Sequence, residues 1–162
     1  MAKKKAKDDG GSKPGSPRIR NRRAWHDYHI SEKVECGIEL TGTEVKSIRN
    51  GQVKLDEAHA RIKDGEVYLI GAEISLYPQA VEAMQHHPNR PRRLLLHKRQ
   101  IAQLQLHVQQ KGHTVVPLEM YFKRGWAKVS LGLAEGKQQY DKRDSIKKRD
   151  QQRDIDRDMS RR

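Results

Sequence analysis

Carboxylates that could carry acid–base chemistry lie close together in one short stretch of the sequence. Glu32, Glu35 and Glu39 are of the residue type that general acid–base catalysis uses. No glycine-rich phosphate loop accompanies them, because "GG" and "GLAEGK" lack the required spacing. We therefore interpret the three glutamates as polar positions on strand faces. We therefore expect no catalytic residue in this chain, and we do not expect the protein to be an enzyme.

The same stretch contains side chains that bind metals. His26, His29 and Cys36 could suggest zinc, but a structural zinc site normally needs four ligands at paired spacings. The next candidates, His86 and His87, are remote in sequence. We expect no metal site and no cofactor. The apolar, β-leaning surroundings of Cys36 favour a buried, inert thiol over a nucleophile.

Aromatic residues beside basic residues indicate a different chemistry. They occur in "NRRAWHDYH" and in "YFKRGWAK". Basic side chains bind phosphates, and aromatic rings stack on unpaired bases, so this combination favours nucleic-acid binding. We expect Phe122 to fill the core and Tyr28 to lie at the surface. The aromatic residues with a possible binding role are Trp25, Tyr28, Tyr121 and Trp126.

The charge of the chain is concentrated at its ends. The 162 residues carry a formal net charge of +13. Met1–Ala24 has nine Lys or Arg against two Asp, and Lys137–Arg162 has ten against six acidic residues. The middle is nearly neutral. Basic arms on a neutral body indicate a polyanionic partner, and nucleic acid is the commonest one.

The sequence also predicts a compartment. The single cysteine, Cys36, has no partner for an internal disulfide, which is typical of a reducing cytosol. No apolar run approaches membrane-spanning length, and the start "MAKKKAKDDGG" lacks the apolar stretch of a secretion signal. We expect a cytoplasmic protein with no membrane partner.

Short strands joined by tight turns dominate the expected elements. Asp64-Gly65 and "KRG" are turn signals between alternating stretches, so each marks a hairpin. Pro117 cannot donate to a ladder, so its strand must lie at an edge or carry a bulge. We expect β-leaning stretches at 25–30 and 34–42, followed by helical turns over 43–51 that Thr43 caps. A hairpin over 58–74 and a loop with a short helical turn over 77–93 come next. The remaining expected elements are a brief strand at 94–97, a helix over 97–112 and a hairpin over 113–137.

These elements predict a mainly β protein with helices. The best fit is a small antiparallel β-barrel of the oligonucleotide-binding (OB) type, closed or partly open, with two or three flanking helices. We expect a disordered basic arm over 1–20, the RNA-binding barrel over 21–136 and a charged tail over 137–162.

Several segments resemble one family. They include "NRRAWHDYHI", "VECGIELTGTEVKSIRNGQ", "IKDGEVYLIGAEI", "RRLLLHKRQI", "GHTVVPLEMYF", "WAKVSLGLAEGK" and "YDKRDSIKKRD". In order and spacing they are similar to the bacterial tmRNA-binding proteins of the small protein B (SmpB) family, from about Asn21 to about Asp150. The resemblance implies an OB-type adaptor without catalytic activity.

The resemblance also implies partners. Such an adaptor binds the tRNA-like domain of tmRNA and brings it to ribosomes stalled on messages that lack a stop codon, so that the nascent chain is tagged for degradation. Elongation factor Tu acts on the same RNA. The positions that match the family's RNA-contacting residues are Asn21, Arg23, Tyr28, Glu35, Leu95 and Lys128. Leu95 is more simply explained as a core residue.

The family's C-terminal tail implies a second site. It is loose in the free protein and becomes helical in the empty mRNA channel near the ribosomal decoding centre. Tyr140 stands where the family commonly has His, so a stacking role survives but an imidazole role does not. The tail residues that we assign to this contact are Tyr140, Asp141, Lys142, Arg143, Lys147, Lys148, Arg149 and Arg153.

The tail's own pattern predicts a helix of marginal stability. Arginines recur every four residues from Arg149 to Arg157, and aspartates do so from Asp150 to Asp158. This spacing forms Asp–Arg pairs three residues apart, each worth a few tenths of a kcal/mol, but it also places like charges four apart. A helix of this kind needs a partner, so folding on binding is expected.

Two other functions stay open on the residues alone. One is a different OB-like translation factor or ribosomal protein that binds ribosomal RNA directly. The other is an enzyme, for instance a nuclease using Glu35 and a histidine, although no grouping of catalytic residue types in the sequence supports this function.

Overall fold

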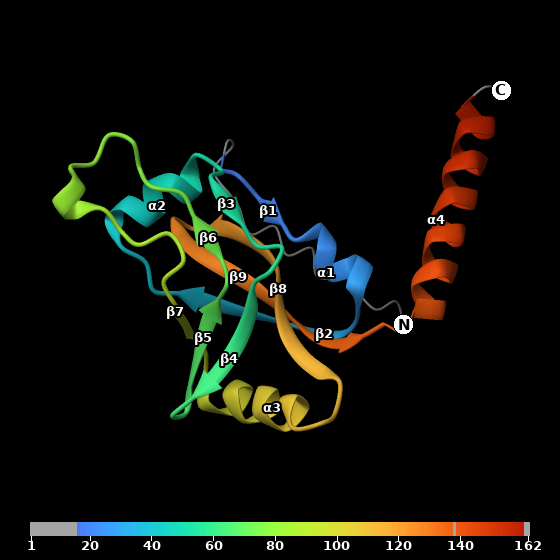
Figure 1. Cartoon of the computed structure of the whole chain (residues 1–162), viewed down its shortest axis with the longest axis horizontal. Coiled ribbons are helices and arrows are strands. Elements are labelled where there is room, and N and C mark those ends of the chain that lie inside the picture. The colour runs from blue at the N-terminus through green and yellow to red at the C-terminus, as the bar shows by residue number, and fades with distance from the viewer. Residues whose placement is uncertain (1–15, 138, 161–162) are drawn as a thin grey trace, which may run out of the picture.

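The computed structural model describes residues 16–137 and 139–160. Seven antiparallel strands form one sheet in the order β1-β8-β9-β2-β7-β5-β4 (Figure 1). Their bounds are β1 (Ile19–Arg20), β2 (Tyr28–Ile38), β4 (His59–Lys63), β5 (Glu66–Ile70), β7 (Arg92–Leu95), β8 (His113–Lys123) and β9 (Trp126–Gly136). A second sheet pairs β3 (Val53–Lys54) with β6 (Glu73–Ile74).

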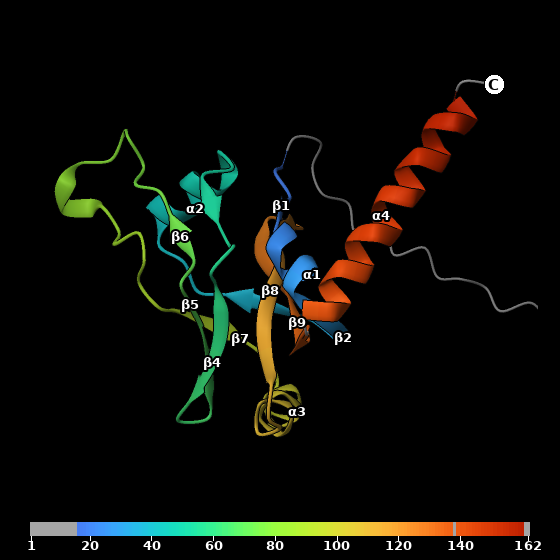
Figure 2. The ribbon, with the colours of Figure 1, turned by 45° about the vertical axis from the view of Figure 1, so that its right-hand side comes forward.

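Helices lie around the sheet rather than inside it. They are α1 (Arg22–Asp27), α2 (Gly42–Arg49), α3 (Lys98–Val108), α4 (Gln139–Ser160) and a 3-10 turn, η1 (Glu82–Met84). The prediction of a mainly antiparallel β protein with flanking helices is confirmed. The sheet curls until β4 approaches β8 (Figure 2), but no ladder joins these two strands, so the barrel is open along this seam. Within the described ranges, no helix is long and apolar enough to cross a membrane.

Both expected hairpins are present, and their turns explain why. Asp64 and Gly65 have φ of 52° and 75°, and Arg124 and Gly125 have φ of 52° and 83°. Two consecutive positive φ values match the right-handed twist of the flanking strands. The β4–β5 and β8–β9 registers are therefore set locally.

Bulges on two strands switch the side chains that face the core. The register of β8 shifts between Pro117 and Glu119, so the bulge expected from Pro117 is present. Val116 and Leu118 pack in a small cluster beneath α1, whereas Met120 and Phe122 face the main core. One extra residue inverts the alternation of a strand, which is why residues of the same parity reach opposite faces. A similar shift lies between Ile30 and Glu32 of β2.

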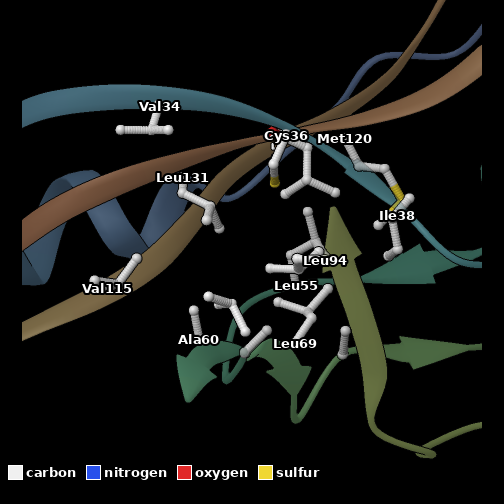
Figure 3. Packing of buried hydrophobic residues seen from close by; sticks show 14 of the residues in the cluster. Val34, Cys36, Ile38, Leu55, Ala60, Leu69, Leu94, Val115, Met120 and Leu131 are labelled. Atoms are coloured by element: carbon white, nitrogen blue, oxygen red, sulfur yellow. Dashed lines mark hydrogen bonds between the residues drawn. The ribbon is translucent and has the colours of Figure 1, made fainter. Parts of the chain in front are cut away.

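The main core fills the inside of the curled sheet. Figure 3 shows side chains from β2, β5, β7, β8 and β9 pointing toward one another, with Leu55 between them. Leu69, Met120 and Leu131 are fully buried. Close apolar packing holds these strands rigidly against one another. The backbone positions of the residues on their outer faces are therefore well defined.

The stretch "WHDYHI" is not a strand throughout. Trp25, His26 and Asp27 belong to α1, so the expectation of a strand over 25–30 was wrong for its first half. Asn21 caps the helix, because its side-chain oxygen accepts a hydrogen bond from the backbone N–H of Ala24 at 3.0 Å. The cap and the burial of Ala24 override the β preference of the aromatic residues. At the other edge, Ile19 and Arg20 already pair with β8, so the sheet begins inside the range expected for the arm.

Helix α2 contains a buried ionic cluster. Its N-cap is Thr41, not Thr43, and Glu44 closes a capping box with it. Glu44 also accepts from Arg92 Nε at 2.8 Å and from Arg90 Nη2 at 2.6 Å. Arg92 is fully buried and donates to the carbonyls of Ala72 and Pro88 at 2.9 and 2.8 Å. The cluster thereby holds the long loop before β7 against α2.

Candidate nucleic-acid interface

Three functional candidates lie on the outer face of β2, β8 and β9. Cys36, Met120 and Val129 point into the core, so alternation places their neighbours Glu35, Tyr121 and Lys128 outside. Tyr121 pairs directly with Lys128, and Glu35 pairs with Ser130 two residues farther along β9. Residues 93 positions apart in sequence thus form one surface.

Glu35 is held as an anion on this surface. The Tyr121 hydroxyl donates a hydrogen bond to its carboxylate, and Lys123 Nζ lies 3.4 Å from each carboxylate oxygen. The hydrogen bond from Tyr121 lowers the pKa of Glu35 most, and Lys123 and the charge of Lys128 lower it further against the opposing effect of partial burial. The sequence had singled out Tyr121, but Lys123 was missed, because nothing in a sequence tells which lysine faces which carboxylate.

A hollow joins Glu35 to two other predicted RNA contacts. It has a volume of about 610 Å³, and Glu35, Leu95 and Lys128 all line it. Leu95 is 50% exposed, so its interpretation as a core residue was wrong. The reason is the alternation of β7: Leu94 faces the core, and Leu95 must face outward.

The other three predicted contacts line a separate hollow. Asn21, Arg23 and Tyr28 surround a space of about 370 Å³ between α1, β8 and the segment before β4. Arg23 lies 3.3 Å from Asp27 and 3.5 Å from Glu57, at the surface. The six predicted residues are therefore placed at two hollows, three at each.

Asn21 has a structural role in this second hollow. It is 1% exposed, and its amide nitrogen donates to the carbonyls of Leu55 and Pro117, each at 2.9 Å. Since its oxygen caps α1, every polar atom of the side chain is engaged within the fold. Tyr28 is half-buried and packs on the cluster beneath α1.

The aromatic candidates differ in exposure. Phe122 is buried in the core, as expected. Trp25 is partly covered by Lys33, whose Nζ lies 4.8 Å from its ring centroid, and Arg18 lies 5.1 Å from the centroid of Tyr121. Trp126 is 74% exposed at the β8–β9 turn. Two of these rings, Trp25 on α1 and Tyr121 on β8, thus have a cation beside them.

The tail residues lie along α4, which extends away from the sheet (Figures 1 and 2). Arg143, Lys147, Lys148, Arg149 and Arg153 are exposed. The expected ion pairs are present, with Asp150–Arg153 at 3.8 Å and Asp154–Arg157 at 3.7 Å. The side chains of Tyr140, Asp141 and Lys142 lie outside the part of the chain that the structure describes.

Metal or thiol chemistry finds no support at these positions. Among the side chains that the structure describes, no three of His, Cys, Asp or Glu are grouped to hold a metal. Cys36 donates to the carbonyl of Val129 at 3.3 Å, and burial raises the pKa of its thiol to about 12. Glu32 accepts from Gln103 at 2.7 Å, and Glu39 pairs with Arg93 at 2.9 Å, as expected for polar positions on the surface.

Comparison with known proteins identifies the family. The family model described as "SmpB protein" matches residues 18–161. The chain belongs to the SmpB family. The match spans both hollows and α4, so all the positions predicted from the resemblance lie inside it.

Individual members of the SmpB family are similar over nearly the whole chain. An SsrA-binding protein of Ligilactobacillus salivarius is 48% identical over 98% of this chain and 97% of its own length. An SsrA-binding protein of Carboxydothermus hydrogenoformans is 54% identical over 84% of this chain and 91% of its own. A chain of the solved structure described as "tmRNA-SmpB: a journey to the center of the bacterial ribosome" is 47% identical, with a TM-score of 0.66, over 81% of this chain and 95% of that one.

Proposed function

We propose that this SmpB-family protein is the RNA-binding adaptor of trans-translation. Its barrel binds the tRNA-like domain of tmRNA, the RNA also called SsrA, and delivers it to ribosomes stalled on messages without a stop codon. The nascent peptide is then tagged for degradation and the ribosome is released. The protein works in the cytoplasm as a non-catalytic partner of tmRNA, the ribosome and, through alanyl-tmRNA, elongation factor Tu.

One observation carries the RNA-binding part of this proposal. Glu35, Leu95 and Lys128 come from three different strands and line one hollow. Lys128 can neutralise a phosphate, and Leu95 offers an apolar surface to a sugar or base. Glu35 would repel phosphate, so its carboxylate serves as a fixed acceptor for base N–H or 2′-hydroxyl donors. This combination suits a folded RNA better than a bare polyanion.

The hollow beneath α1 contributes a second contact. Arg23 is exposed beside it and can exchange its carboxylate partners for a phosphate. Asn21 acts as a positioning residue, because its buried amide ties α1 to Leu55 and Pro117. Tyr28 lies at the junction of α1 and β2, where its ring can pack against ribose.

The tail supplies the ribosome contact. Every described side chain of α4 is exposed, so packing of these side chains against the barrel adds no support to the helix. Helices of this charge pattern are marginal without a partner. The mRNA channel near the decoding centre is lined with RNA phosphate and would attract the arginine face. We assign this contact to Tyr140, Asp141, Lys142 and Arg143 at the start of the tail and to Lys147, Lys148, Arg149 and Arg153 farther along it.

A binding experiment on the full chain tests the RNA assignment. The affinity for the tRNA-like domain of tmRNA is measured for the wild type, Lys128→Met and Lys54→Met. Lys54 is the matched control, since it is exposed on β3 and lines neither hollow. We expect Lys128→Met to weaken binding about tenfold or more and Lys54→Met to leave it nearly unchanged. Equal losses would mean that only total charge matters, and an absence of wild-type binding would refute the function.

A further inference from the structure

A third hollow adjoins the one that contains Glu35. It has a volume of about 440 Å³ and lies where the β8–β9 turn meets the end of β2. Its apolar walls include Leu40, Phe122 and Trp126, and it shares Gly37, Leu95 and Lys128 with the larger hollow. The two spaces therefore adjoin at these three shared residues.

Gly37 lies where the two hollows adjoin, and we call this place the passage. Across β2 it pairs with Lys128 on one side and with Leu95 on the other, so the three residues form one row across the sheet. A Cβ atom at Gly37 would lie 3.3 Å from Leu95 Cβ, closer than ordinary contact. The backbone of Gly37 does not have the positive φ that would require glycine. Because glycine has no side chain, the space above position 37, between Leu95 and Lys128, is left unfilled.

Trp126 presents a large aromatic surface at the outer end of this hollow. It is 74% exposed, although an indole ring gains more from burial than almost any other side chain. Lys123 lies directly opposite it in the hairpin, Arg124 is in the turn, and Lys128 is on the hollow's wall. An apolar protein segment or a lipid tail would have to desolvate these cations. A nucleotide avoids this cost, because its flat base can stack on the indole while its phosphate pairs with the cations.

We propose that this hollow is a subsite for one unpaired nucleobase of the bound RNA, stacked on Trp126, with its phosphate at Lys128. The proposal rests on the proposed function and extends it, because the RNA that enters the Glu35 hollow continues over Gly37 to Trp126. The subsite would favour an RNA that has an unpaired base beside a double-stranded segment, because such a base can unstack from its neighbours and bind to Trp126. Shape and stacking, not base-edge hydrogen bonds, would set this preference.

Substitutions of Trp126 in the full chain test the subsite. Loss of one base–aromatic stack predicts that Trp126→Ala and Trp126→Leu weaken binding to the tRNA-like domain by about 5- to 150-fold. Trp126→Phe, which retains an aromatic face, should lie close to the wild type. The salt dependence of binding should stay unchanged in all three variants, because no phosphate contact is lost. Thermal unfolding of each variant verifies that the hairpin is intact.

A direct readout comes from fluorescence. The chain has two tryptophans, so Trp25→Phe leaves Trp126 as the only indole. Stacking on a base should quench the emission of Trp126 when the RNA is added. Separately, Gly37→Ala should weaken RNA binding by narrowing the passage.

An unchanged affinity in Trp126→Leu with unquenched Trp126 emission would overturn the subsite. If Lys128→Met still weakens binding in that case, the proposed function stands and only the subsite fails. A loss confined to ribosome binding would assign Trp126 to a different partner and would also overturn it.

Discussion

The hydroxyl of Tyr121 donates a hydrogen bond to the carboxylate of Glu35 across β9, the strand that separates the two residues. Lys123 Nζ lies 3.4 Å from each oxygen of the same carboxylate. A glutamate in a basic surface would otherwise be free to adopt many rotamers. Here its oxygens are held at a fixed place next to Lys128, so the surface presents an acceptor and a cation side by side.

Removing this hydroxyl should change the titration of Glu35. Tyr121→Phe deletes the largest contribution that lowers the pKa of Glu35, so the pKa should rise toward the ordinary value of a glutamate. A lowered folded-state pKa stabilises the protein above the unfolded-state pKa, and this stabilisation is lost as the pH falls through the folded-state value. The stability difference between wild type and Tyr121→Phe should therefore exist at neutral pH and shrink in acid. Carboxyl NMR titration and unfolding at several pH values measure both effects, and an unmoved pKa would refute the stated cause.

Lys128 should behave as a single phosphate contact. Lys128→Ala should weaken tmRNA binding and reduce the slope of log affinity against log salt by about one unit. Titrations at four or more salt concentrations give this slope. If the affinity falls and the slope does not, Lys128 contacts a base or positions Glu35 instead.

The buried ionic cluster should dominate the stability of the loop and of α2. Hydrogen bonds from Arg90 and from the Thr41 backbone, with the charge of Arg92, hold the pKa of Glu44 below its usual range, although burial alone would raise it. Glu44→Gln leaves the buried Arg92 without its counter-ion, which should cost about 3–5 kcal/mol in the free energy of unfolding.

Glu39→Gln is the matched control for this substitution. Its ion pair with Arg93 has the same chemistry but is exposed, so its loss should cost at most about 1 kcal/mol. Urea unfolding compares the two variants. Similar losses would mean that the cluster on Glu44 is no more important than a surface pair.

The start of the tail should separate tagging from RNA binding. Simultaneous Asp141→Ala, Lys142→Ala and Arg143→Ala should leave the affinity for tmRNA nearly unchanged and abolish tagging on a stop-less message. The reason is that these residues belong to the tail, which we assign to the ribosome, whereas we assign the two hollows that contain Glu35 and Asn21 to the RNA. A parallel loss of affinity and tagging would contradict this division.

Local signals in the sequence predicted much of this fold. The Asp64-Gly65 and Arg124-Gly125 turns set two hairpins, and Pro117 indicated the bulge in β8. These features depend on a few adjacent residues, so a single sequence contains them. Helix α1 was missed because its cap, Asn21, is also tied to Leu55 and Pro117, which are far along the chain.

The site was only partly predictable for a related reason. The apolar run over 94–96 does not show which residue faces the core, so Leu95 was assigned to the wrong side. Glu44 and Arg92 are 48 positions apart, and no pattern announces such a pair. The importance of Gly37 follows only from the strands on either side of it. The six predicted RNA contacts were identified from the resemblance to the family. Only the fold shows that three of them line one hollow and three line another.

The most direct measurement compares the full chain with a version that ends at Gly136. Both are assayed for affinity to the tRNA-like domain of tmRNA and for peptide tagging on ribosomes stalled at the end of a stop-less message. We predict that truncation preserves the affinity and abolishes tagging, because the barrel holds the RNA and the tail reaches the ribosome. A comparable loss of RNA affinity on truncation would contradict this account and would make the tail part of the RNA-binding surface.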